Sequence, residues 1–241
     1  MKIGLVDVDG HNFPNHALMK ISAYHKAQGD TVEWADPLFA DYDRVYKSKI
    51  FTFSPDDKYD YGCEVIKGGT GYDIKSRLPE EIENHNELDY SIYPQYPFTI
   101  VFFSRGCIRR CPFCLVHDKE GSIHPVTPTN LNPNGQWIEV LDNNFFANPT
   151  WKESIDWLLE KKQPVKLHGV DVRIMTSTTS ESHRNTRRIL HAGLTSNGCL
   201  SHATLLTSRH ARDSNANNIL SGTFALEAIP SDICSRYLQF I

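Results

Sequence analysis

The sequence lacks long apolar runs and carries little net charge, and both absences exclude classes of protein. Its longest apolar stretch, around Ile100–Phe103, is far below the roughly 18 residues that span a bilayer. The apolar run before Asp7 covers only residues 3–6, too few for a signal-peptide core. The net charge of −4 argues against non-specific binding to nucleic acid or anionic membranes, although it leaves a local basic groove open. We therefore predict a cytoplasmic protein without a membrane partner.

Cysteine is also scarce, since six residues in 241 are too few for a disulfide scaffold. Three of them, Cys107, Cys111 and Cys114, lie close together, whereas the others are scattered at positions 63, 199 and 234. In a reducing compartment such a group indicates a metal site before a disulfide. We assign no metal to Cys199 or Cys234.

The first 95 residues show the pattern of an α/β domain. Apolar runs predict strands at Lys2–Val8, Thr31–Trp34, Arg44–Phe53 and Glu64–Ile66, and helical spacing lies between Pro14 and Gly29. This alternation predicts a small doubly wound parallel sheet with covered faces. Ligands of such sheets sit beyond the carboxyl ends of the strands, where residues 9–12 and 68–71 would lie.

Residues 96–175 predict a second α/β domain, after a proline-containing stretch at 73–97 whose composition is typical of a linker. Strands are expected at Thr99–Phe103, Gln136–Leu141 and Val165–Val170, with an amphipathic helix at Thr150–Lys162. The order of strand, helix and strand again indicates parallel pairing.

The remaining residues, 176–241, have a different character. Residues 1–166 contain 13 Lys and 5 Arg, whereas residues 167–241 contain 7 Arg and no Lys. One interpretation is a polar, partly disordered tail; the other is translation out of frame, because altered codon reading produces such a change. Under both, the many Ser and Thr residues offer little apolar area to offset the cost of ordering, so we expect an atypical, poorly packed segment.

The cysteine group carries the chemistry of this sequence. It has the spacing C-x3-C-x2-C and directly follows the apolar strand at Thr99–Phe103. Most iron–sulfur clusters are held by four thiolates, so three thiolates leave one iron of a four-iron cluster open to another ligand. Three unrelated core cysteines are a poorer explanation, because Arg105, Arg109, Arg110 and Asp118 make this a polar loop.

This loop resembles the signature of the radical S-adenosylmethionine (SAM) superfamily, C-x3-C-x-aromatic-C after the first strand of a partial (β/α) barrel. Phe113 fills the aromatic position and is expected to bind cofactor. The resemblance implies that Cys107, Cys111 and Cys114 ligate a [4Fe-4S] cluster and that SAM chelates the fourth iron. It also implies reductive cleavage of SAM, hydrogen abstraction from an unknown substrate, and an electron donor such as flavodoxin or ferredoxin.

Residues after the next two strands are candidates for contact with SAM. Members of the superfamily often carry Gly-Gly-Glu after the second strand, where this chain has Asp142, Asn143 and Asn144. Their oxygens can accept hydrogen bonds from an ammonium group, or they can form an Asx turn. After the third strand, Asp171 and Arg173 are candidates for the SAM ribose or carboxylate, or for a surface ion pair.

The N-terminal segment resembles the cobalamin-binding-type domain that precedes the barrel in one branch of the superfamily. This resemblance rests on Pro14-Asn15 with Leu18, on residues 29–32 and on Gly68-Gly69. It implies methyl or methylthio transfer, with cobalamin as a second cofactor. Asp9-x-His11 matches the start of the cobalt-ligating Asp-x-His-x-x-Gly motif, but Pro14 occupies its glycine position. His11 is thus either a cobalt ligand or a turn residue.

Two other functions remain open. A structural zinc site could use the three cysteines with His117 as its fourth ligand. Alternatively, the chain is an inactive, truncated member of the superfamily, because a complete barrel would need further strand–helix units after Arg173.

Overall fold

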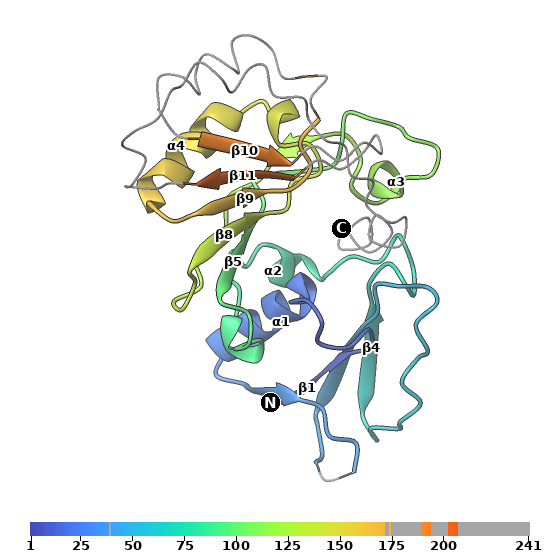
Figure 1. Ribbon diagram of the computed structural model, residues 1–241. Coiled ribbons are helices and arrows are strands. Elements are labelled where there is room, and N and C mark those ends of the chain that lie inside the picture. The colour runs from blue at the N-terminus through green and yellow to red at the C-terminus, as the bar shows by residue number, and fades with distance from the viewer. Residues whose placement is uncertain (39, 172–173, 175–188, 194–201, 207–241) are drawn as a thin grey trace. The chain divides into compact units, whose positions relative to one another are not determined.

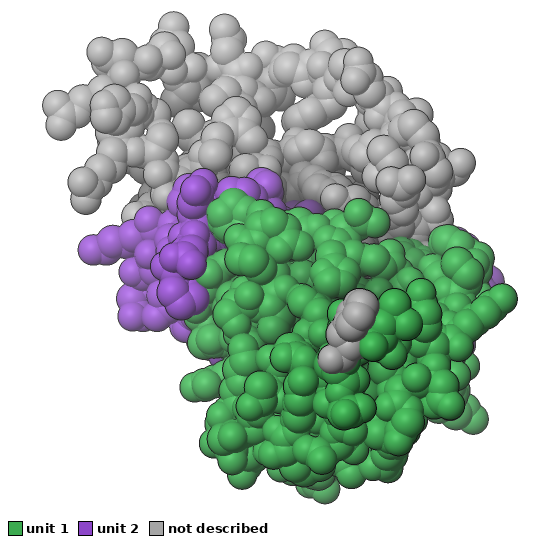
Figure 2. Space-filling view, turned by 90° about the horizontal axis from the view of Figure 1, so that it is seen from below, with its two compact units in different colours: residues 1–97, 129–132, 235–241 green, residues 98–128, 133–234 purple. Residues whose placement is uncertain are grey.

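The computed structural model describes residues 1–38, 40–171, 174, 189–193 and 202–206 (Figure 1). The chain divides into two compact units (Figure 2): the described residues up to 97, together with 129–132, form the first, and the second begins at Phe98. The predicted domain boundary after residue 95 falls close to this division. Arg173, Cys199 and Cys234 lie outside the described residues.

The first unit is built on a four-stranded parallel sheet. Its strands are β1 (Lys2–Asp7), β2 (Thr31–Trp34), β3 (Arg44–Ser48) and β4 (Glu64–Gly68). They lie in the order β2-β1-β3-β4, and all three pairings are parallel. Ile3, Leu5 and Val45 are fully buried in its core. The predicted α/β class and the parallel pairing are confirmed.

Helix α1 (His16–Ala27) packs against one face of this sheet and buries Leu18 and Met19. It begins two residues after Pro14 because the Asn15 side chain caps it, accepting a hydrogen bond from the Leu18 N–H at 3.2 Å. At the other end Gly29 takes a positive φ of 83°, as expected for a residue that ends a helix.

The connections from β2 to β3 and from β3 to β4 contain no helix in the residues that the structure describes. The helices that a doubly wound sheet carries on both faces are therefore seen here on one face only. Strand β3 also ends at Ser48 and not at Phe53. The Asp9 carboxylate accepts the backbone N–H groups of Ile50 at 2.5 Å and Phe51 at 3.3 Å, which takes these residues out of the sheet ladder.

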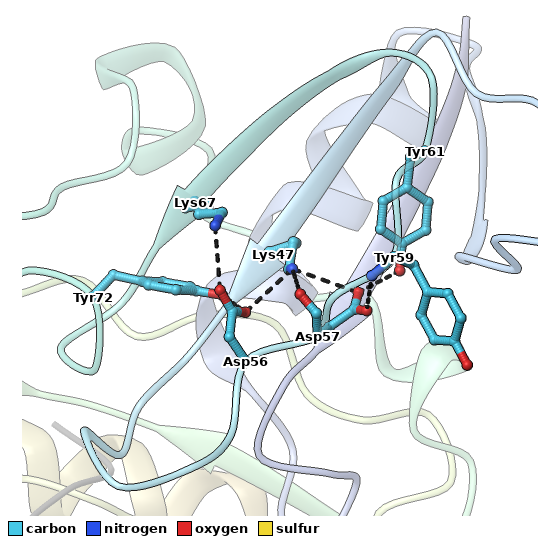
Figure 3. Close-up of polar contacts among 7 residues, drawn as sticks. All are labelled: Lys47, Asp56, Asp57, Tyr59, Tyr61, Lys67 and Tyr72. Atoms are coloured by element: carbon cyan, nitrogen blue, oxygen red, sulfur yellow. Dashed lines mark hydrogen bonds and ion pairs between the residues drawn. The ribbon is translucent and has the colours of Figure 1, made fainter.

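The loop after β3 covers the second face of the sheet and is held there by Lys47 (Figure 3). The Lys47 side chain is 3% exposed and lies 3.2 Å from the Asp56 carboxylate and 3.5 Å from that of Asp57. Tyr61 donates a hydrogen bond to Asp57 at 2.5 Å, and Tyr72 donates one to Asp56. Ion pairs centred on the buried Lys47 thus hold this loop in a connection that has no crossover helix among the described residues.

Residues 73–97 are part of the first unit, so the prediction of a linker is wrong. They contain helix α2 (Glu80–Glu83) and the 3-10 turn η1 (Tyr90–Ile92), and both contact α1. Ile82, Leu88 and Tyr93 are buried. Lys20 of α1 donates a hydrogen bond to the Glu83 carbonyl at 2.5 Å. The prolines mark turns between packed elements and not a flexible connection.

The second unit is built on a five-stranded mixed sheet. Strands β5 (Phe98–Val101), β8 (Trp137–Val140) and β9 (Val165–Leu167) pair in parallel, and helix α4 (Trp151–Lys161) connects β8 to β9. Between β5 and β8 lie the hairpin β6 (Ser104–Arg105) with β7 (His124–Pro125) and the helix α3 (Val116–Glu120). The turn η2 (Phe145–Ala147) follows β8.

Beyond β9 the sheet changes direction. Strands β10 (Ile189–Gly193) and β11 (His202–Leu206) form an antiparallel pair, and β11 pairs antiparallel with β9. The described residues therefore form no barrel, and the partial (β/α) barrel stays a prediction. These two strands extend the sheet, whereas the expectation of poor packing after residue 176 concerns side chains that lie outside the described part of the structure. No helix in the described part of the chain is long and apolar enough to cross a membrane.

Candidate functional site

The three clustered cysteines lie on the loop between β6 and α3. Cys107, Cys111 and Cys114 are half-buried, and none forms a disulfide. Burial raises the pKa of the Cys107 thiol, a hydrogen bond from the Arg109 N–H lowers it, and the nearby Cys114 and Cys111 thiols raise it further. The Cys111 and Cys114 thiols thus lie close enough to affect the ionisation of Cys107.

The donor types on this loop fit an iron–sulfur cluster, because three free thiols can each bind one iron. The side-chain positions do not by themselves form a metal site: no three His, Cys, Asp or Glu side chains converge on a common point in the part of the chain that the structure describes. Phe113 is 68% exposed beside the thiols, with Ile108 and Leu115 also exposed. An aromatic ring open to solvent can stack on a ligand.

The start of the loop is fixed by Glu120, at the end of α3. Its carboxylate accepts the Gly106 N–H at 2.8 Å and the Asn143 amide at 3.0 Å, and it pairs with Arg105. Gly106 has a φ of 77°, and a Cβ there would overlap the Ser122 carbonyl oxygen. Sequence reasoning missed Glu120, because a Glu at the end of a short polar helix has no distinguishing spacing.

Asp142 connects the end of β8 to the end of β5. It is 1% exposed and accepts hydrogen bonds from the Phe103 N–H at 2.8 Å and the Ser104 hydroxyl at 2.5 Å. Burial raises its pKa to about 6, although these hydrogen bonds act in the opposite direction. Both of its oxygens are engaged by residues 103 and 104, a bridge between strand ends that differs from both the predicted Asx turn and the predicted contact with SAM.

The two asparagines that follow have different surroundings. The Asn143 amide donates to the Gly106 carbonyl at 3.3 Å as well as to Glu120, which joins the end of β8 to the cysteine loop. Asn144 is 2% exposed, and its Oδ1 has no hydrogen-bond partner among the described residues. A buried acceptor of this kind is costly unless a donor reaches it. The Asn144 oxygen therefore needs a donor that the described residues do not supply.

Asp171 follows β9 and lies at the same edge of the sheet. One of its oxygens accepts two hydrogen bonds from the Arg109 guanidinium, at 2.7 and 3.0 Å. An ion pair was the predicted alternative to ligand contact for Asp171. The pair with Arg109 connects the end of β9 to the cysteine loop. The structure thus brings the loop together with Asn143 and Asp171, at the carboxyl ends of the parallel strands.

A polar group inside the sheet was also missed. Glu139 of β8 is buried and accepts hydrogen bonds from His168 at 2.5 Å and Lys166 at 3.0 Å. Burial would raise its pKa, but the bonds from His168, Trp137 and Lys166 outweigh burial and lower the pKa to about 2. The sequence contains a signal for this group: Glu139 interrupts an apolar strand, and a buried carboxylate requires hydrogen-bond or charged partners.

In the first unit, Asp9 and His11 make different kinds of contact: Asp9 forms hydrogen bonds, and His11 packs on aromatic rings. The Asp9 carboxylate closes the loop after β3 and also accepts the Ser54 hydroxyl at 2.5 Å. The His11 ring packs on Trp34, with centroids 4.1 Å apart, and on Tyr93 at 5.7 Å, and burial lowers the pKa of His11. These contacts favour a turn residue over a cobalt ligand.

Asp7, at the end of β1, accepts a hydrogen bond from Tyr93 at 2.7 Å. Burial raises the pKa of Asp7 to about 7. The nearby Asp9 charge raises this pKa further, whereas the hydrogen bond from Tyr93 lowers it. A carboxyl group whose folded pKa is raised binds more protons in the folded state, so stability falls as pH rises between the unfolded and folded values.

We therefore expect Asp7→Asn to stabilise the first unit by about 1–2 kcal/mol at about pH 8, and by much less at about pH 5. The amide oxygen can still accept from Tyr93, and no charge is buried. Urea unfolding of the full chain at the two pH values measures the effect. Asp41→Asn, at an exposed position in the same unit, serves as control. A gain independent of pH would contradict the prediction.

Comparison of the chain with protein-family models, curated proteins and solved structures found no match. The assignment of function therefore depends on the residues of this chain and their geometry.

Proposed function

We propose that the chain is a radical SAM enzyme whose [4Fe-4S] cluster is held by Cys107, Cys111 and Cys114. The observation that carries this proposal is the place of the C-x3-C-x2-C loop. It follows a buried strand and is bonded to residues after the next two parallel strands, Asn143 and Asp171. Ligands of parallel α/β sheets bind at this edge.

The surrounding residues have roles that suit this chemistry. The bound cluster would supply the electron that splits SAM into methionine and a 5′-deoxyadenosyl radical. Asn144 offers an unmet, buried oxygen to the SAM ammonium group, and Phe113 offers an exposed ring to its adenine. Asp142 and Glu120 hold the backbone that carries the loop. The resemblance of the first unit suggests methyl or methylthio transfer as the reaction subclass.

The test is anaerobic reconstitution of the full chain with iron and sulfide. We expect about four irons and four sulfides per chain, as for one four-iron cluster. With dithionite and SAM, the reconstituted protein should form 5′-deoxyadenosine, measured by liquid chromatography. Cluster assembly without any cleavage of SAM would identify an inactive member of the superfamily. No retained iron would reject the proposal.

A structural zinc site is the second candidate, and one observation favours it. His117 of α3 follows the cysteines, and its Nδ1 is buried with no hydrogen-bond partner in the described residues. Zinc usually takes four protein ligands in structural sites, and this nitrogen would complete the set. About one zinc per chain after purification, lost in His117→Ala, would favour zinc over the cluster.

A further inference from the structure

We propose that Glu120 positions the cysteine loop and that its buried charge lowers the reduction potential of the cluster which the loop would hold. The inference rests on the proposed function. It assigns a role to a carboxylate that is outside the cysteine motif and that no spacing in the sequence marks.

The positioning role follows from what the carboxylate holds. Glu120 is only 6% exposed, and its partners come from three places: Gly106 before the first cysteine, Asn143 after β8, and Arg105 of β6. The next residue, Gly121, accepts the Cys107 N–H at 3.2 Å. One short segment thus fixes both the residue before Cys107 and Cys107 itself. Without the carboxylate, the buried Gly106 N–H would lose its acceptor, which is unfavourable.

The electrostatic role follows from burial. Reduction adds one negative charge to an iron–sulfur cluster, and the potential depends on the charges and hydrogen bonds around it. A carboxylate with little solvent exposure acts through a medium that screens poorly, so it opposes the added charge. Arg105 pairs with the carboxylate, but solvent screens its charge more than that of Glu120, because the two side chains are 27% and 6% exposed. A lower potential makes the reduced cluster a stronger reductant, which reductive cleavage of SAM requires.

Two substitutions separate the two roles. Glu120→Gln keeps an oxygen that can accept the Gly106 N–H but removes the charge, whereas Glu120→Ala removes both. We expect Glu120→Gln to retain wild-type iron and sulfide while its midpoint potential, measured by redox titration with electron paramagnetic resonance, shifts to more positive values. Glu120→Ala should retain several-fold less iron. Glu153→Gln, exposed on α4, should match wild type in both measurements.

Unchanged potential in Glu120→Gln, or full iron in Glu120→Ala, would overturn the corresponding half of the inference. If the wild-type chain takes up no iron, the proposed function is rejected, and with it the effect of Glu120 on the reduction potential of the cluster. The positioning role is then measured on the metal-free chain by trypsin cleavage after Arg109 and Arg110. Cleavage several-fold faster in Glu120→Ala than in Glu153→Gln would support positioning, and equal rates would reject it.

Discussion

Replacing Cys111 by Ala is expected to remove the iron–sulfur cluster, reducing iron and sulfide to background. The same result is expected for Cys107→Ala and Cys114→Ala. Each thiolate would hold one iron, and the loop contains no fourth cysteine that could replace a lost one. Iron and sulfide analysis of the anaerobically reconstituted variants, together with visible absorption, measures the effect.

The matched control is Cys63→Ala, which removes a half-buried thiol in the first unit, away from the loop in sequence. It should retain the full cluster, because Cys63 is not one of the proposed ligands. Loss of iron in this control would mean that reconstitution reports only the number of thiols. Far-UV circular dichroism of the metal-free variants should match wild type, so that loss of iron reflects loss of a ligand. A Cys111→Ala protein with a full cluster would count against the assignment of these ligands.

The features that the sequence predicts well are those with a local cause. Strand β2 was predicted at Thr31–Trp34, where the structure has it, and α4 was predicted within one residue at each end. Both follow from apolar periodicity and from turn residues close by in the chain. The position of the cysteine loop directly after a buried strand is local as well, so its placement at the edge of the sheet could be foreseen.

Features that depend on contacts distant in sequence could not be foreseen. The run at Arg44–Phe53 has strand propensity throughout, yet β3 ends at Ser48 because the Asp9 carboxylate accepts the N–H groups of Ile50 and Phe51. The linker prediction at 73–97 was wrong for the same reason. Ile82 and Leu88 are buried, but they stand among prolines and polar residues, so no apolar periodicity indicates their burial. Strands β10 and β11 lack apolar periodicity; β11 pairs with β9, and β10 pairs with β11.

The candidate site divides in the same way. Its cysteines form a motif that can be recognised from residue types and spacing alone. Glu120 and the pairing of Arg109 with Asp171 emerge only when α3 and β9 are brought to the loop. Residues that hold a motif in place are selected by geometry, and many sequences can supply that geometry. A single sequence does not mark them, because their distance along the chain from the motif follows no fixed spacing.

The second large effect is expected from the ion pairs that Lys47 forms with the loop after β3. Lys47→Met should destabilise the first unit by about 1–3 kcal/mol, below the range for a fully buried pair, because Asp56 is 34% exposed and keeps its ion pair with Lys67. The methionine side chain fills most of the same volume, but Asp56 and Asp57 lose their shared cation. Native-state hydrogen exchange of the β3 and β4 amides, measured by mass spectrometry, reports the free energy of opening. Lys58→Met, exposed in the same loop, should change it by less than about 0.5 kcal/mol.

The pH dependence distinguishes the ion pairs from simple packing. Burial alone would raise the pKa of Asp56 and of Asp57, but the hydrogen bonds from Tyr72 and Tyr61, together with Lys47, lower both. A carboxylate whose folded pKa is depressed contributes stability above its unfolded value, which is near 3.8, and this contribution is lost as pH falls through the folded value. The difference between wild type and Lys47→Met should therefore be largest near neutral pH and shrink on acidification below about pH 4. A difference that stays constant down to about pH 2 would mean that Lys47 acts through its methylene groups, because protonation of the carboxylates would then change nothing.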